Sequence, residues 1–378
     1  MPDIILSPGV RSNLLALQQT TDLISNTQTR LATGKKVNTA LDNAASFFLS
    51  SSFRSSANNL TTLLDGISTA SRTLDAANSG ITSLTTLINS AQATLNQALA
   101  SAPTTAVTTG TVSNLTTASS FATTAAKTIT VSDGVTTTTY NTVGVTTTVA
   151  QIINAINTTP LQTVKAELSG SGQILLEAQG ATTITIGGTI SAAELAQFGL
   201  VAGVTAAGTL NSSRTTFAAQ YDALRAQIDQ LAADSGYNGV SLLNGGGLKV
   251  LFNEKGTSSM SLVGSTDTST GLGVVASTGS FQTNFDVNAA LTNVANALVT
   301  LKTQASTFAS NVSVIQARTD FTKSQINTLN SGADGLVLAD SNQEGANLLA
   351  LQTRQQLSST ALSLATQADR NVLRLFGG

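Results

Sequence analysis

A long apolar repeat occupies residues 46–100, SFFLSSSFRSSANNLTTLLDGISTASRTLDAANSGITSLTTLINSAQATLNQALA. One line of apolar side chains recurs every seven residues: Phe53, Leu60, Ile67, Leu74, Ile81, Ile88 and Leu95. A second line lies three residues after each position from Leu60 onward: Leu63, Ala70, Ala77, Leu84, Ala91 and Ala98. Steps of three and four place both lines on one helix face, and seams of this length are typical of coiled-coil packing. The stretch therefore predicts a rod-like helix about 80 Å long, at about 1.5 Å per residue. Its apolar face needs partner helices.

A second heptad pattern near the other end of the chain predicts such a partner. Its apolar positions are Val287, Val294, Leu301, Phe308, Ile315 and Leu329, interrupted at Thr322. This pattern predicts a helix of about 45 residues, long enough to pair with most of the first rod.

Each rod is flanked by a shorter amphipathic helix toward its chain end. The first is predicted over residues 12–33, with Leu14, Leu17, Ile24 and Leu31 on one face and Gly34 as its stop. The second begins near Ser341, which has the capping-box spacing to Glu344. Its stripe is Leu357, Ala361, Leu364, Ala368, Val372 and Leu375.

Between Thr104 and Gly208 the heptads give way to alternating residues rich in Thr, Ala, Gly and Val. Strands are predicted over 128–131, 135–140, 164–168 and 174–177, with a further strand around Ile184. A short helix is predicted over 149–156, and a second opens with the capping box of Ser191 and Glu194. This part of the chain is an α+β insert.

Helical spacing returns over residues 217–231, followed by a turn at 237–239 and a hairpin formed by 248–252 and 259–263. The predicted fold class is mainly α. Antiparallel coiled-coil-like rods come from the N- and C-terminal segments and carry a small β-hairpin and the insert. The predicted domains are an N-terminal helix and connector at 1–44, a long rod at 45–103, the insert at 104–210, rod helices and hairpin at 211–331, and a C-terminal helix at 332–378.

The composition argues against most catalytic chemistry. The 378 residues include no Cys, His or Trp, so a zinc site of the ordinary type, a cysteine nucleophile and a histidine triad are all excluded. The 20 acidic residues are scattered along helical faces, and no phosphate-binding glycine motif follows a strand. We therefore expect no enzyme activity, no catalytic residues, no cofactor and no metal.

Charge and hydropathy also exclude two classes of partner. A formal net charge of −2 does not predict binding to nucleic acid. The mean hydropathy of +0.17 comes from dispersed Ala, Val and Leu, and no apolar run approaches the roughly 18 residues of a membrane span. The N-terminus lacks the basic segment and apolar core of a cleavable secretory signal.

Three motifs resemble those of bacterial flagellin. Residues 30–45, RLATGKKVNTALDNAA, are similar to the family's Arg-Leu-Ser-[Ser/Thr]-Gly-x-x-[Ile/Val]-Asn-x-Ala-x-Asp-[Asp/Asn]-Ala-Ala pattern. Residues 237–243, YNGVSLL, resemble its Phe-Asn-Gly-x-x-Leu-Leu turn, and residues 371–375, NVLRL, resemble its C-terminal helix. The resemblance covers residues 1–103 and 211–378. The chain departs from it at Ser46, where many members have Gly, in its LFGG terminus and in the position of the insert.

The resemblance implies a structural subunit of the flagellar filament that serves swimming motility. It implies export without a cleaved signal, an extracellular location, self-polymerisation, and contact with the export apparatus, a chaperone, the filament cap and hook-associated proteins. The terminal helices are too short and too weakly amphipathic to stay ordered alone, so we expect them to order on assembly. The expected assembly interface is Leu14, Leu17, Ile24, Leu31, Leu357, Ala361, Leu364, Ala368, Val372 and Leu375. The expected rod core is Phe53, Leu60, Ile67, Leu74, Ile81, Ile88, Leu95, Val294, Leu301, Phe308 and Ile315.

Three alternatives remain open. A hook–filament junction protein would share the plan of terminal helices but would form a short collar in place of a long polymer. A coiled-coil adhesin stalk would place its heptads in one continuous block beside a membrane anchor, whereas here an insert splits them. An enzyme within the insert is the remaining alternative, and no group of residues there supports it.

Overall fold

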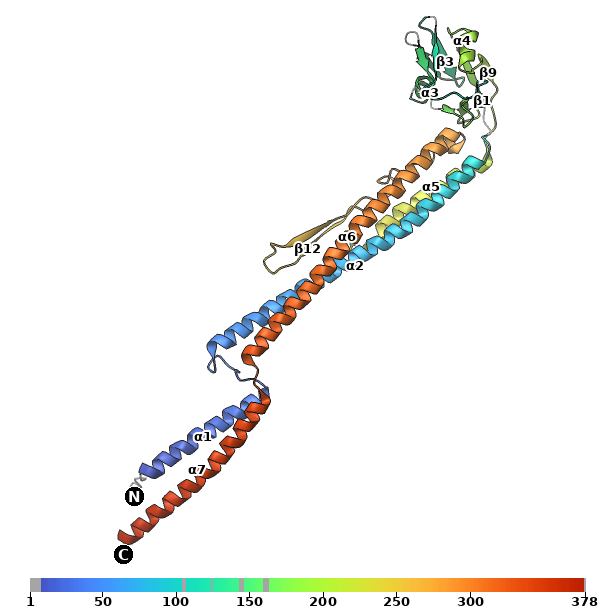
Figure 1. Cartoon of the computed structure of the whole chain (residues 1–378). Helices are drawn as coiled ribbons and strands as arrows, with labels where there is room; N and C mark the ends of the chain where they lie inside the picture. Colours follow the sequence, from blue (N-terminus) through green and yellow to red (C-terminus); the bar gives the residue numbers. More distant parts are fainter. Residues whose placement is uncertain (1–7, 104–106, 124, 143–145, 159–162, 377–378) are drawn as a thin grey trace. The chain divides into compact units, whose positions relative to one another are not determined.

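The computed structural model describes residues 8–103, 107–123, 125–142, 146–158 and 163–376, with side chains to residue 371. It is mostly helical, with long terminal helices and small antiparallel sheets, so the coarse fold class is confirmed (Figure 1). The chain divides into two compact units. The first comprises residues 1–68, 251–259 and 317–378, and the second comprises residues 69–250 and 260–316.

Four helices contribute to the first unit. They are α1 (Pro8–Thr33), the beginning of α2 (Ala44–Ala100), the end of α6 (Asn284–Val337) and α7 (Ser341–Phe376). The α1 helix ends where predicted, because Gly34 has a φ of +66° and supplies the left-handed residue that follows many helices. α1 and α7 pack against each other (Figure 1).

The two loops that connect the long helices to α1 and α7 are hydrogen-bonded to each other. The Lys36 amide donates to the Val337 carbonyl at 2.8 Å, and the Ala339 amide donates to the Gly34 carbonyl at 2.9 Å. These bonds satisfy backbone groups that helix ends would otherwise leave unpaired. The C-terminal end of α1 and the N-terminal end of α7 are therefore joined by backbone contacts as well as by side chains.

The predicted capping box at Ser341 and Glu344 is wrong. Asp340 caps α7, since its Oδ1 accepts from the amides of Asn342 at 2.9 Å and Gln343 at 3.3 Å. An aspartate in this position satisfies the free amides of the first turn and carries the charge that a helix N-terminus favours. The Glu344 side chain is thereby free for another contact, described below.

The second unit contains the rest of α2, the helix α5 (Ser212–Asp234) and the beginning of α6. α5 lies beside α2. At the start of α5, the Asn211 side chain donates to the carbonyl of Ala102, just beyond the end of α2, at 2.7 Å. At its other end, a Cβ on Gly80 of α2 would lie 2.4 Å from the Ser235 Oγ. Only glycine fits at that approach.

Two hairpins follow α5. β10 (Gly236–Tyr237) pairs with β11 (Val240–Ser241) through a turn in which Asn238 and Gly239 have φ values of 50° and 79°. An Asn-Gly pair tolerates this geometry better than other residues do. β12 (Gly247–Leu251) and β13 (Ser259–Val263) form the second hairpin where the sequence predicts it.

The described residues of the insert form three small sheets and two short helices around one core. Its helices are α3 (Val149–Thr158) and α4 (Ala192–Gln197), and the Ser191–Glu194 capping box is present. The strand orders are β1-β7-β6, β2-β5 and β4-β3-β8-β9, all antiparallel. The strands are β1 (Val107–Thr109), β2 (Ser120–Ala122), β3 (Thr128–Ser132), β4 (Thr137–Asn141), β5 (Thr146–Thr148), β6 (Val164–Leu168), β7 (Ile174–Ala178), β8 (Ile184–Gly188) and β9 (Gly203–Thr205).

The sequence does not predict β1, β2, β5 and β9, which are three residues long each. Such short strands carry too few residues to establish an alternating pattern. These strands are defined by their pairing with strands distant in sequence. In β2, for example, Phe121 pairs with Thr147 of β5. The core under the sheets includes Ile129, Ile152, Ile174 and Phe198, all fully buried.

We predict that a charge inside the α6 seam unfolds the second unit. Leu301 is 0% exposed and Val299, two residues earlier on the same helix, is 63% exposed. Leu301→Asp should cost about 3–5 kcal/mol of unfolding free energy because it buries an unpaired charge. Val299→Asp places the same charge in water and should change stability by about 0.5 kcal/mol or less. Urea denaturation followed by circular dichroism compares the two, and equal midpoints would contradict the placement of the seam.

Candidate functional site

The α1–α7 pair is the first candidate for an assembly surface. The inward face of α1 carries Val10, Thr20, Ile24 and Thr27, which are buried. Near the base of the pair, the Arg30 guanidinium lies 3.5 Å from the Glu344 carboxylate. Because the Arg30 side chain is 41% exposed, this ion pair orients the two helices more than it stabilises them.

The structure places the predicted assembly residues in three different environments. Ile24 is buried and Leu17 is half-buried, so both contribute to contacts inside the unit. The exposed members are Leu14, Leu31, Leu357, Ala361, Leu364 and Ala368. Val372 and Leu375 lie in α7, but their side chains are outside the described part of the chain.

The inward face of α7 carries residues that the sequence analysis did not single out. Leu348, Leu351 and Leu362 are half-buried, with Gln355 and Ser358 between them on the same face. These residues follow one another in regular steps of three and four. Because two of the five are polar, a search for apolar periodicity does not detect the row. Leu357 and Leu364 lie on the other side of the helix and are 66% and 62% exposed. α7 therefore has two apolar faces, of which α1 covers one.

The predicted rod core is mostly buried. Side chains with 5% exposure or less are Ile67, Leu74, Ile81, Ile88, Leu95, Val294, Leu301, Phe308 and Ile315. Phe53 and Leu60 are only half-buried. The Phe53 ring lies against the position of Gly332, whose added Cβ would be 3.4 Å away.

A groove beside Leu60 explains its partial exposure. Leu60, Phe252, Phe321 and Leu329 line this groove, which has a volume of about 410 Å³. The Arg318 guanidinium lies 5.1 Å from the centre of the Phe252 ring, a cation–π contact that positions the hairpin tip. Phe321 is 59% exposed.

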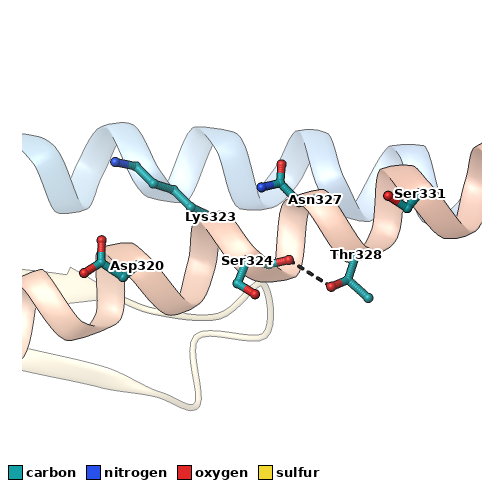
Figure 2. Close-up of a pocket in the computed structure, with 6 residues that line it drawn as sticks. All are labelled: Asp320, Lys323, Ser324, Asn327, Thr328 and Ser331. Atoms are coloured by element: carbon teal, nitrogen blue, oxygen red, sulfur yellow. Dashed lines mark hydrogen bonds between the residues drawn. The ribbon is translucent and has the colours of Figure 1, made fainter.

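A second hollow lies along α6 in the same unit. Figure 2 shows its lining residues on one helix: Asp320, Lys323, Ser324, Asn327, Thr328 and Ser331. The Thr328 hydroxyl donates to the Ser324 carbonyl at 2.9 Å, an ordinary bond within a helix. Because one helix provides the whole lining, this polar surface does not enclose a ligand site.

A buried polar cluster lies in the second unit, where the insert meets α5 and α6. We call Arg214, Glu167, Glu177 and Asp286 the junction cluster. Arg214 is fully buried, and its three hydrogen bonds reach the Ser101 carbonyl at 2.8 Å, the Phe281 carbonyl at 3.1 Å and the Asn284 Oδ1 at 2.6 Å. One guanidinium thus holds the end of α2, the 3₁₀ turn η1 (Gly279–Phe281) and the start of α6.

Burial dominates the electrostatics of the cluster. It raises the pKa of Glu177 to about 7 and also raises the pKa of Glu167 and of Asp286. Burial lowers the pKa of Arg214, and the negative charges of its acidic neighbours partly offset this decrease. The three carboxyl groups of the cluster therefore bind protons more readily than they would in water.

The described residues offer no other site with evident chemistry. Within them, no group of His, Cys, Asp and Glu side chains is placed to hold a metal ion. Among the described helices, none has the length and apolar character that crossing a bilayer requires.

Comparison with known proteins shows that the N-terminal part of the chain is similar to bacterial flagellins. Residues 10–132 match the family model of the bacterial flagellin N-terminal helical region. Flagellin FljM of Caulobacter vibrioides is 34% identical over 158 residues, which are 41% of this chain and 57% of the relative. Flagellin A of Rhizobium meliloti is 38% identical over 91 residues, 24% of this chain and 23% of the relative. The resemblance to bacterial flagellin is confirmed. The chain spans 57% of the length of the Caulobacter relative and 23% of the length of the Rhizobium relative.

We predict that Arg214 is required for the stability of the second unit. Arg214→Ala would leave the Ser101 and Phe281 carbonyls buried without donors and remove a positive charge that acts on three carboxyl groups. The expected loss is about 3–5 kcal/mol of unfolding free energy. Arg72→Ala removes an exposed arginine from α2 in the same unit and should cost about 0.5 kcal/mol or less. Similar denaturation midpoints for the two variants would contradict the structural role of Arg214.

Proposed function

Since residues 10–132 match the family model of the bacterial flagellin N-terminal helical region, we propose that this chain is a structural subunit of a bacterial flagellar filament. That match is the observation on which the proposal chiefly rests. The motifs at 237–243 and 371–375 support it from the other end of the sequence. The role is structural and extracellular, in swimming motility, and needs no catalytic residue.

The proposed mechanism of assembly uses the outer faces of α1 and α7. Leu15 and Leu23 on α1, and Leu349, Leu357 and Leu364 on α7, are all exposed in the single chain. Five large apolar side chains on a two-helix pair are costly to leave in water. In the proposed filament, neighbouring copies bury them, so apolar burial drives polymerisation.

The same feature relates assembly to export. α1 has 26 residues and packs against α7 through a face that includes buried threonines, Thr20 and Thr27, and few large apolar groups. Because this interface buries little apolar surface, we expect the α1–α7 pair to be only marginally stable in the single chain. We propose that the chain ends are ordered by assembly, which would suit passage through the export apparatus with a chaperone before the subunit reaches the filament cap.

The insert has its own core and is proposed to lie on the outer surface of the filament. Inserted domains are tolerated at exposed sites where few contacts cross their boundary. Here the contacts that do cross are concentrated in the junction cluster.

The alternative function is that of a hook–filament junction protein with the same terminal helices. Negative-stain electron microscopy of the concentrated protein separates the two functions. A filament subunit should form long homopolymers, while a junction protein should not extend beyond short assemblies.

Two truncations test the proposal directly. Removal of residues 1–33 or 341–378 should leave a folded protein that stays monomeric, because each removes half of the α1–α7 pair. Circular dichroism checks the fold and sedimentation checks assembly. Filament growth by either truncated protein would refute the role of the pair.

We also predict that single charges on the outer face of α7 block assembly without unfolding the chain. Leu364→Asp should leave the melting temperature unchanged, since Leu364 is 62% exposed, and should raise the critical concentration for polymerisation at least tenfold. Gln367→Asp adds the same charge at an exposed polar position of α7 and should raise it far less. Equal effects on polymerisation would show that charge on α7, and not loss of the apolar contact, is responsible.

A further inference from the structure

The insert is attached to the first turn of α6 by polar contacts from strands β6 and β7. The Asn284 amide, at the start of α6, donates to the Glu177 Oε2 of β7. Just beyond β7, the Gln179 Nε2 lies 2.8 Å from both carboxylate oxygens of Asp286. The Asn288 Nδ2 donates to the Glu167 Oε2 of β6 at 3.3 Å. Three acidic side chains therefore lie at one small junction.

We propose that a proton on Glu177 holds the insert in place on α6, and that loss of this proton loosens the insert from the helix. The junction cluster would then act as a pH-sensitive attachment between two parts of the second unit. This inference concerns the single chain and does not depend on the proposed role in a filament.

The geometry provides few partners for an ionised Glu177. The residue is 1% exposed, and its Oε1 has no hydrogen-bond partner among the described residues. Its Oε2 accepts one amide hydrogen, although a buried carboxylate needs several donors to replace its water. A carboxylate in this position would be desolvated and only partly compensated.

The charged neighbours do not supply the missing compensation. Arg214 of α5 uses its hydrogen bonds on the neutral oxygens of Ser101, Phe281 and Asn284, so it forms no direct ion pair with Glu177. Lys165 of β6 lies over the Phe285 ring, with its Nζ 5.7 Å from the ring centre. Two acidic side chains, Glu167 of β6 and Asp286 of α6, also lie nearby. Their negative charges disfavour a further negative charge on Glu177.

Three effects favour the ionised form of Glu177, and the effects that oppose ionisation outweigh them. The Asn284 amide and the Arg214 charge lower its pKa, and the N-terminus of a helix also favours an anion. Burial and the neighbouring acids Glu167 and Asp286 raise it, and the balance leaves the pKa at about 7 against an ordinary 4.5.

The sign of the pH effect follows from this shift. Because the folded chain holds the proton more tightly than the unfolded chain, the attachment is strongest below pH 4.5 and is lost as the pH rises through about 7. Burial also raises the pKa of Glu167 and Asp286, so these groups act in the same direction.

Spin labels can measure the attachment, because the chain has no native cysteine. We would introduce Val135→Cys in the insert and Val299→Cys on α6, both at exposed positions of the second unit. Pulsed electron paramagnetic resonance on dilute full-length protein gives the distribution of distances between the labels. We expect a narrow distribution at pH 5.5 and one at least twice as wide at pH 8.5.

Glu177→Gln is the decisive variant, because a glutamine stays neutral at both pH values and retains an acceptor for the Asn284 amide. It should keep the distribution narrow at pH 8.5. Glu254→Gln removes an exposed carboxylate from the β12–β13 hairpin and should behave like the unmodified chain. A width independent of pH in the unmodified chain, or equal broadening in Glu177→Gln, would overturn the proposal.

A second measurement covers the case in which Glu177→Gln does not fold. Hydrogen exchange of the Asn284 amide in the unmodified chain, corrected for its intrinsic pH dependence, should lose protection between pH 5.5 and pH 8.5. The Ser46 amide, which donates to the Asn43 Oδ1 at 3.0 Å in the first unit, is the reference. A parallel change at both amides, or no change at Asn284, would refute the proposal.

Discussion

The burial of continuous apolar seams on the long helices is the constraint on which the rest of this structure depends. Ile67, Leu74, Leu84, Ile88 and Leu95 of α2 are all fully buried. A helix of 57 residues with such a stripe is stable only where other elements cover it, since propensity alone does not sustain helices in water. Ser, Thr and Asn fill the exposed faces, where their low helix propensity is tolerated because the seam supplies the stability.

The terminal helices differ from the rods in how little of their apolar surface the single chain buries. α1 and α7 cover each other with a face that includes Thr20 and Thr27, while leucines such as Leu357 and Leu364 remain in water. A monomeric protein gains nothing from this arrangement, but a subunit that polymerises does. The Arg30–Glu344 pair and the backbone bonds near Gly34 align the two helices and leave their outer faces uncovered.

The junction cluster has a different physical character from the seams. Apolar seams act over many residues and are insensitive to pH, whereas the cluster concentrates charge in a few buried groups. Arg214 connects three elements through hydrogen bonds to neutral oxygens, and the nearby carboxyl groups compete for the protons and donors that remain. Buried polar groups of this kind specify one arrangement of the parts, at a cost in stability.

The sequence by itself determined the helices, since heptad spacing is a local property that survives without a partner. It predicted the end of α1 at Gly34, the Asn238–Gly239 turn and the family resemblance. Tertiary structure alone decided which face of α7 meets α1, because Leu348, Leu351 and Leu362 are separated by polar residues that no periodicity rule selects. It also decided that Asp340 caps α7 and that the Asn284 amide donates to Glu177. The α1–α7 and Asn284–Glu177 contacts join residues far apart in sequence, and apolar spacing indicates a buried helix face but not which polar side chains meet there.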